Sequence, residues 1–175
     1  MSNKSFSLDV PRMGYFLVYK SEGSFFSNQI VKKQLRSGFT PKQARVSHVE
    51  VSGGGQNSIN TSPPRSKLID ITKAHKGRYV YIMKYRDEAY DIHGRYKVAY
   101  FSATLNNVGY DILGALRFVF KWIKQNNRLF FCSEGALWSL QKQYANALNI
   151  EPKDTMPAHF MNEKYFKCVW SGIIS

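Results

Sequence analysis

Short runs of β-forming residues are interspersed with helical patterns along the chain, and this order limits the fold more than any other feature of the sequence. Apolar, β-branched and aromatic residues bounded by Gly, Pro or polar turns predict strands at 14–20, 46–51, 57–61 and 78–85. Apolar residues at helical spacing predict helices at 25–37, before Gly38, and at 112–124 and 132–148. The pattern of residues 96–105 fits either a helix or a strand. We therefore expect an α+β fold in which a mostly antiparallel sheet, or a partial barrel, packs against helices.

The length and composition indicate one compact domain over residues 1–175. The chain has 175 residues, of which 43% are hydrophobic and 15% are aromatic, and this is enough for a single hydrophobic core. The first ten residues, MSNKSFSLDV, lack the apolar stretch of a secretory leader, and the longest apolar runs are too short for a transmembrane helix. We expect a protein that is cytoplasmic as synthesised, with its site of action left open.

The charge of the chain is strongly positive and is spread along the sequence. Lys and Arg number 25 against 12 Asp and Glu, which gives a formal net charge of +13, and no basic run exceeds two adjacent residues. A folded surface of this charge favours electrostatic contact with an anionic polymer or a membrane surface. No helix-turn-helix, zinc-finger or RNA-recognition signature occurs, so no specific nucleic acid is predicted. A basic, non-enzymatic nucleic-acid-binding protein that stacks bases on its 11 Tyr and 12 Phe is an alternative function.

Two cysteines, Cys132 and Cys168, have the spacing of neither a disulfide scaffold nor a metal site, so we expect no metal and no cofactor. Cys132 begins the predicted helix 132–148. The unpaired N–H groups and the positive dipole end of a helix favour a thiolate there, which makes Cys132 a candidate nucleophile. Ala136 and Leu140 follow it at four-residue spacing and place the thiol on the buried face of the helix. A structural thiol is the alternative, because cysteine is often buried as a small hydrophobic residue.

His48 is the one histidine of four that lies within a predicted strand. In VSHVEV, strand alternation places Val49 and Val51 on one face and Val46, His48 and Glu50 on the other. An imidazole on a strand that meets the start of a helix can serve as general base for a thiol and then as general acid for the leaving group. The alternative is a solvated histidine on an exposed strand face.

Several short motifs occur in the order found in a known enzyme family. They are GYFLVYK (14–20), SHVEV (47–51), INTSP (59–63), GYDILG (109–114), FFCSE (130–134) and TMPAHF (155–160). Together they resemble the circularly permuted NlpC-type hydrolases of the papain-like superfamily, the YiiX-like group, which has bacterial and phage members. One position departs from the pattern, since Tyr15 stands where the group usually has Asp after the first glycine. The resemblance covers nearly the whole chain and implies a papain-like fold.

The resemblance also implies a set of catalytic residues. It places the nucleophile at Cys132, the general base at His48 and the residue that orients the imidazole at Asn60, on the strand that follows the histidine strand. Glu50 competes with Asn60 for the orienting role. It shares the strand face of His48 at a distance of about 6.6 Å along the strand, and a carboxylate stabilises an imidazolium better than an amide does.

The reaction that the resemblance implies is acyl transfer to a thiol. We expect a hydrolase that cleaves an amide bond, of a peptide or a cell-wall peptide, through a covalent thioester on Cys132, with its backbone N–H in the oxyanion hole. A lipid or ester acyltransferase or hydrolase of the same superfamily, acting on an acyl lipid, is the alternative. An inactive adaptor is a third possibility, against which the intact residue set argues. Glu134 is interpreted as a helix-capping residue, and Tyr110 and Asp111 as structural support near the cleft.

Overall fold

A six-stranded antiparallel sheet organises the computed structural model, which describes residues 11–112 and 129–175. Neighbouring strands follow the order β4-β3-β2-β1-β5-β6, and all five pairings are antiparallel. The strands are β1 (Phe16–Lys20), β2 (Val46–Gly54), β3 (Asn57–Asn60), β4 (Lys67–Asp70), β5 (Tyr79–Tyr85) and β6 (Phe166–Ile173). The expected α+β class with an antiparallel sheet is confirmed.

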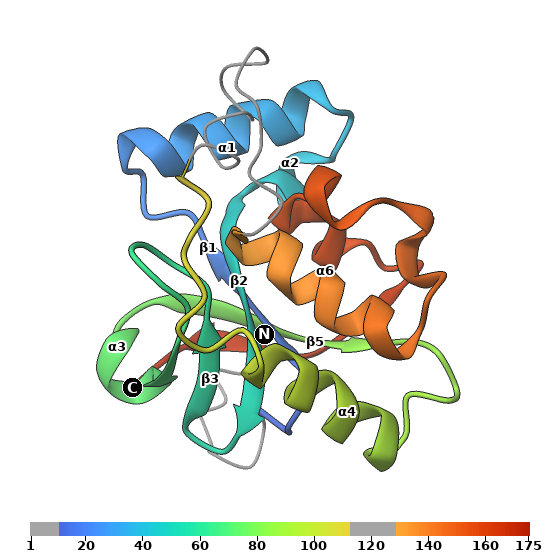
Figure 1. The fold of residues 1–175 in the computed structure, drawn as a ribbon. Helices are drawn as coiled ribbons and strands as arrows, with labels where there is room; N and C mark the ends of the chain where they lie inside the picture. The colour runs from blue at the N-terminus through green and yellow to red at the C-terminus, as the bar shows by residue number, and fades with distance from the viewer. Residues whose placement is uncertain (1–10, 113–128) are drawn as a thin grey trace.

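Helices cover this sheet and close the fold. They are α1 (Phe25–Arg36), α2 (Pro41–Ala44), α3 (Ile71–Ala74), α4 (Ile92–Ala103) and α6 (Cys132–Gln143), with 3₁₀ turns η1 (Ala147–Asn149), η2 (Pro152–Asp154) and η3 (Pro157–Met161). Figure 1 shows α6 lying across β2 with α4 beside it, and α4 and α6 contact each other as well as β2. The start of α6 is thereby held against the strand that carries His48.

The centre of the core is β1, which is flanked by β2 on one side and β5 on the other. Its residues Phe16, Leu17, Val18 and Tyr19 have no exposed surface. Burying an aliphatic or aromatic side chain of this size contributes about 1.5–3 kcal/mol, so this short segment supplies a large share of the stability. A continuous apolar run is expected for a strand that is covered on both faces.

The Gln34 side chain holds the start of β2 against helix α1 and turn η3. Its side chain is fully buried, and its amide nitrogen donates to the carbonyl oxygens of Ala44 and Val46, both at 2.8 Å. Its amide oxygen accepts from the backbone N–H of Ala158, in η3, at 2.8 Å. The Gln34 side chain therefore joins helix α1, strand β2 and turn η3. Its contact with β2 is at Val46, two residues before His48.

Most of the predicted segments match the structure, with some corrections. The strands expected at 14–20, 46–51, 57–61 and 78–85 and the helix at 25–37 are confirmed as β1, β2, β3, β5 and α1. Residues 96–105, which fitted either state, lie mostly in α4, and the helix expected at 112–124 falls almost entirely outside the described residues. Strands β4 and β6 were not predicted.

The helix expected at 132–148 is wrong at its end, since α6 stops at Gln143. Tyr144 leaves the helical conformation with φ −130° and ψ 80°, and its hydroxyl donates to the carbonyl oxygen of Ala89 at 2.6 Å. Leu148 then has a positive φ of 63°. Ala147 and Leu148 are buried by this change of direction and not on a helix face, so their helical spacing was misleading.

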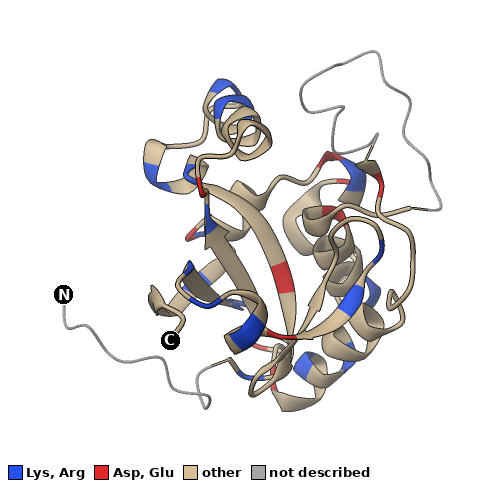
Figure 2. Ribbon diagram, turned by 90° about the vertical axis from the view of Figure 1, so that its left-hand side faces the viewer, with Lys and Arg blue, Asp and Glu red and all other residues tan. Residues whose placement is uncertain are grey.

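Lys and Arg residues lie on helices, strands and loops in several parts of the fold rather than on one segment (Figure 2). No helix within the described ranges is long and apolar enough to span a bilayer.

Candidate active site

Cys132 is the first residue of α6 and is 6% exposed. The preceding Phe131 has an extended backbone, and its N–H donates to the Glu134 carboxylate at 3.4 Å, which confirms the capping interpretation of Glu134. The backbone N–H groups of Val49 and Ser133 lie near the Cys132 sulfur and lower its pKa. The thiol therefore lies where a helix start meets β2, among N–H donors that favour its negative form.

His48, on β2, lies beside the Cys132 sulfur, near enough for each group to shift the pKa of the other. Its side chain is 16% exposed, whereas Val49 and Val51, on the other face of the strand, are almost completely buried. Val46 and Glu50 are buried as well, so burial does not separate the two faces, but the contact between His48 and Glu50 shows that they share one face, as predicted. The structure brings together a thiol and an imidazole that are 84 positions apart in the sequence.

Glu50 lies beneath His48 and accepts hydrogen bonds from four side chains. Its Oε1 atom lies 3.0 Å from His48 Nε2 and 2.6 Å from His75 Nε2. Its Oε2 atom accepts from the hydroxyl of Tyr19 at 3.1 Å and from that of Ser58 at 2.5 Å. The Glu50 side chain has no exposed surface. A carboxylate has about four lone-pair sites, so these donors occupy all of them, which is what a buried negative charge requires.

These contacts change the protonation of all three groups. Burial by itself would lower the pKa of His48, but the Cys132 sulfur and the Glu50 carboxylate outweigh it and raise that pKa to about 10. Burial would raise the pKa of Glu50, yet the hydrogen bonds from His48 and His75 hold it well below the usual range. The pKa of Cys132 is raised by burial and lowered more strongly by the charge and hydrogen bond of His48. The directions of the three shifts favour a thiolate, an imidazolium and a carboxylate in a row.

Asn60 does not make the contact that the resemblance placed there. It is 7% exposed on β3, and among the described residues no hydrogen-bond partner reaches its Oδ1 atom. Because Glu50 occupies His48 Nε2, the ring nitrogen that an orienting residue would hold is already taken. The contact expected of either Asn60 or Glu50 is therefore made by Glu50.

A cleft of about 410 Å³ opens over Cys132 and His48. Its wall combines apolar side chains with small hydroxyl side chains and one acid, and consists of Glu22, Ser24, Phe26, Ser27, Ile30, Ser47, His48, Ser62, Pro63, Tyr110, Ile112 and Cys132. Tyr110 therefore lies at the cleft, and the adjacent Asp111 is buried with its N–H bonded to the Phe130 carbonyl oxygen at 3.0 Å. Both fit the supporting role expected for them.

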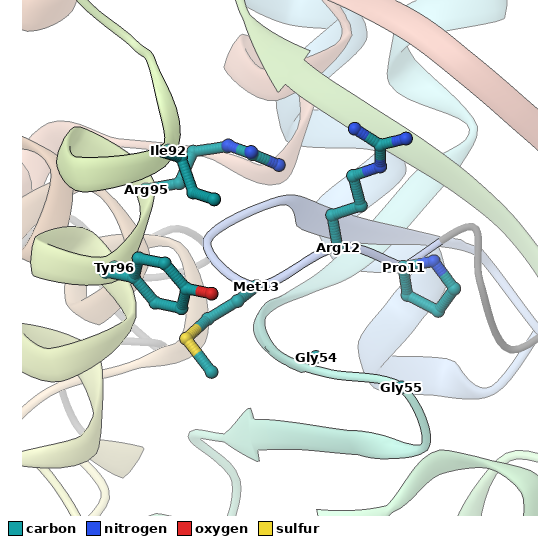
Figure 3. Close-up of a pocket in the computed structure, with 8 residues that line it drawn as sticks. All are labelled: Pro11, Arg12, Met13, Gly54, Gly55, Ile92, Arg95 and Tyr96. Carbon is teal, nitrogen blue, oxygen red and sulfur yellow. The ribbon is translucent and has the colours of Figure 1, made fainter.

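A second cavity, of about 430 Å³, lies elsewhere on the molecule (Figure 3). Its wall consists of Pro11, Arg12, Met13, Gly54, Gly55, Ile92, Arg95 and Tyr96. It contains neither histidine nor cysteine, so the cleft over Cys132 is the better candidate for a catalytic site. Within the described part of the chain, no group of three or more His, Cys, Asp and Glu is arranged to hold a metal ion.

Sequence reasoning missed three partners of Glu50. Tyr19 pairs with His48 across β1 and β2, and Ser58 pairs with Ser52 across β2 and β3, so each lies diagonally across from Glu50 on the sheet. His75 follows α3 in a polar turn, and no periodic pattern marks it. A scan of the chain against protein-family models gave no match, and a comparison with curated proteins found no similar sequence.

Proposed function

We propose that this chain is a thiol hydrolase that cleaves an amide bond through a covalent thioester on Cys132, on a papain-like fold of the permuted NlpC type. The observation that carries the proposal is the row formed by Cys132, His48 and Glu50 at the base of an open cleft. A thiolate beside an imidazolium that a buried carboxylate holds is the arrangement of an activated nucleophile. The order of the motifs and the antiparallel α+β architecture agree with the proposal.

In the first half of the reaction, the Cys132 thiolate attacks the carbonyl carbon and a C–S bond forms. The carbonyl oxygen becomes an oxyanion, which the backbone N–H of Cys132 at the helix start stabilises. The imidazolium of His48 then gives its proton to the amine nitrogen as the C–N bond breaks. The amine leaves and the acyl group remains on sulfur as a thioester.

In the second half, water enters the cleft and the now neutral His48 takes its proton while the oxygen attacks the thioester. The C–S bond breaks, the acid is released, and the thiolate and the imidazolium are regenerated. Glu50 stays ionised throughout, and its role is to hold the ring and stabilise the positive charge on it.

The proposed substrate is a peptide, with a cell-wall peptide as the favoured source. The cleft hydroxyls of Ser47 and Ser62 suit the polar backbone of such a substrate. The net charge of +13 would hold the protein near anionic wall polymers or a membrane surface. Apolar cleft residues such as Phe26, Ile30 and Ile112 support the second candidate, an ester or lipid acyl group.

We expect Cys132 to remain reactive toward iodoacetamide at pH values where Cys168 is not. The pKa of Cys132 is lowered by its neighbours, whereas burial raises the pKa of Cys168. An ordinary thiol, with a pKa of about 8.5, loses thiolate about tenfold for each pH unit below that value. The ratio of the two alkylation rates should therefore rise between about pH 8 and about pH 6. Mass spectrometry of both cysteines in one folded sample measures it.

His48→Ala is the matched variant for this measurement, because it removes the cation beside the sulfur. In this variant the alkylation of Cys132 should fall with decreasing pH as that of an ordinary thiol does. A wild-type protein in which Cys132 already behaves as an ordinary or unreactive thiol would contradict the proposed function.

A further inference from the structure

A second histidine contacts the carboxylate that holds His48. His75 is 6% exposed, and its Nε2 atom lies 2.6 Å from Glu50 Oε1, closer than the 3.0 Å of His48 Nε2 to the same oxygen. His75 follows α3 rather than lining the cleft. The group that it touches is therefore the carboxylate and not a substrate.

Arg78 determines which nitrogen of His75 carries the proton. Its Nη1 atom lies 3.2 Å from His75 Nδ1. A guanidinium is only a donor, so Nδ1 must be the acceptor of this hydrogen bond, and it cannot carry a proton. The remaining nitrogen, Nε2, is then the N–H that donates to Glu50. A neutral His75 with its proton on Nε2 satisfies both neighbours.

Two further groups lie close to the Arg78 side chain. Its Nε atom lies 2.6 Å from Glu22 Oε1, and its guanidinium carbon lies 4.8 Å from the centre of the Tyr19 ring. That ring also packs against His75, with centroids 4.5 Å apart. The charged and titratable groups around His75 are thus Tyr19 from β1, His48 and Glu50 from β2, and Arg78 with its partner Glu22.

Two imidazoles on one carboxylate oxygen compete for one positive charge. If both were protonated, two cations would share a single buried anion, which is costly in a low-dielectric interior. Arg78 removes this competition, because a proton on His75 Nδ1 would face an N–H donor of the guanidinium. The positive charge of the pair then belongs to His48, where it stabilises the thiolate.

We propose that His75 is a positioning residue which, held neutral by Arg78, donates Nε2–H to Glu50 and keeps this carboxylate ionised beneath His48. This inference rests on the proposed function, since it concerns the same thiolate and imidazolium. His75 has this role although it touches neither the substrate nor the sulfur. Without this donor, Glu50 should take up a proton more readily at acidic pH, and the fraction of Cys132 in the thiolate form should fall.

The test compares His75→Leu with His75→Gln by the pH profile of Cys132 alkylation with iodoacetamide. Leucine removes the donor, whereas the glutamine side-chain amide can place an N–H near the position of Nε2. At about pH 5.5 we expect alkylation about tenfold slower than wild type in His75→Leu, which is a shift of one pH unit, and within about twofold in His75→Gln. His93→Gln, at an exposed histidine on α4, is the control and should match wild type.

A second measurement uses the nitrogen chemical shifts of the imidazoles in protein with ¹⁵N-labelled histidine. In the wild type, His75 should carry its proton on Nε2 alone near neutral pH, and Arg78→Met should allow a second proton on Nδ1. This readout also decides the matter if His75→Leu does not fold.

The proposal would be overturned by a wild-type His75 that is protonated on Nδ1, or by a folded His75→Leu with the wild-type alkylation profile. Equal losses in the leucine and glutamine variants would also count against it, because the donor would then not be what matters. If instead the alkylation of wild-type Cys132 followed the pH dependence of an ordinary thiol, the proposed function itself would fail. A failure of the proposed function is therefore distinguishable from a failure of the role given to His75.

Discussion

Replacing Cys132 by Ala is expected to abolish acyl transfer, with a fall of at least about 10⁴-fold in kcat. The sulfur is the atom that forms the thioester, and no neighbouring group of the cleft can replace it, since His48 is held between the sulfur and Glu50. The substitution removes a small side chain at a helix start, so the fold should be retained. Release of p-nitrophenol from p-nitrophenyl acetate, together with mass spectrometry of the acetylated protein, measures the loss.

Cys168→Ala is the matched control for this experiment. Cys168 lies on β6, at an edge of the sheet, and its thiol contacts the Trp170 carbonyl oxygen at 3.3 Å. Its removal should leave both turnover and the acetyl adduct unchanged. A fully active Cys132→Ala protein would refute the mechanism. Salt-dependent DNA binding that Cys132→Ala leaves intact, without any turnover in the wild type, would favour the nucleic-acid-binding alternative instead.

The parts of the fold that could be predicted are those whose signal is local. Strand β1 is a continuous apolar run because it is buried on both faces, and α1 has regular apolar spacing and a terminal glycine. Strands β4 and β6 lack such a signal because each pairs on one side only. In β4, Lys67 and Leu68 are exposed, and in β6 the buried Phe166 and Trp170 are separated by three exposed residues. Their strand state depends on the neighbours that they pair with.

In the candidate site, too, some residues have a local signal in the sequence and others depend on tertiary contacts. Helix chemistry pointed to Cys132 and strand alternation placed His48 and Glu50 on one face, and both inferences needed only neighbouring residues. The choice between Asn60 and Glu50 depended on the distance of each side chain from the imidazole, which an ordered set of motifs does not contain. His75 and Arg78 lie between α3 and β5, so only tertiary structure brings His75 to the carboxylate and Arg78 to His75.

Glu50→Gln is expected to lower kcat by at least about 10²-fold, whereas Asn60→Ala should change it little. Glutamine keeps the shape of the side chain but removes the charge that stabilises the imidazolium of His48, so the pKa of His48 should fall and that of Cys132 should rise. Asn60 makes no such contact among the described residues. The same p-nitrophenyl acetate assay, with the melting temperature of each variant, separates loss of catalysis from loss of fold.

The pH dependence of stability gives a second way to compare the two variants. The pKa of Glu50 is depressed in the folded protein, so its charge stabilises the native state above the unfolded value of about 4.3 and this contribution is lost as the pH falls through the lower folded value. The melting temperature of Glu50→Gln should therefore approach that of the wild type on acidification, while Asn60→Ala should show a constant difference. If Asn60→Ala caused the larger fall in kcat, the orienting role would belong to Asn60. Equal and small effects would mean that neither residue orients His48, and the row of thiolate, imidazolium and carboxylate would then be a structural feature rather than a catalytic one.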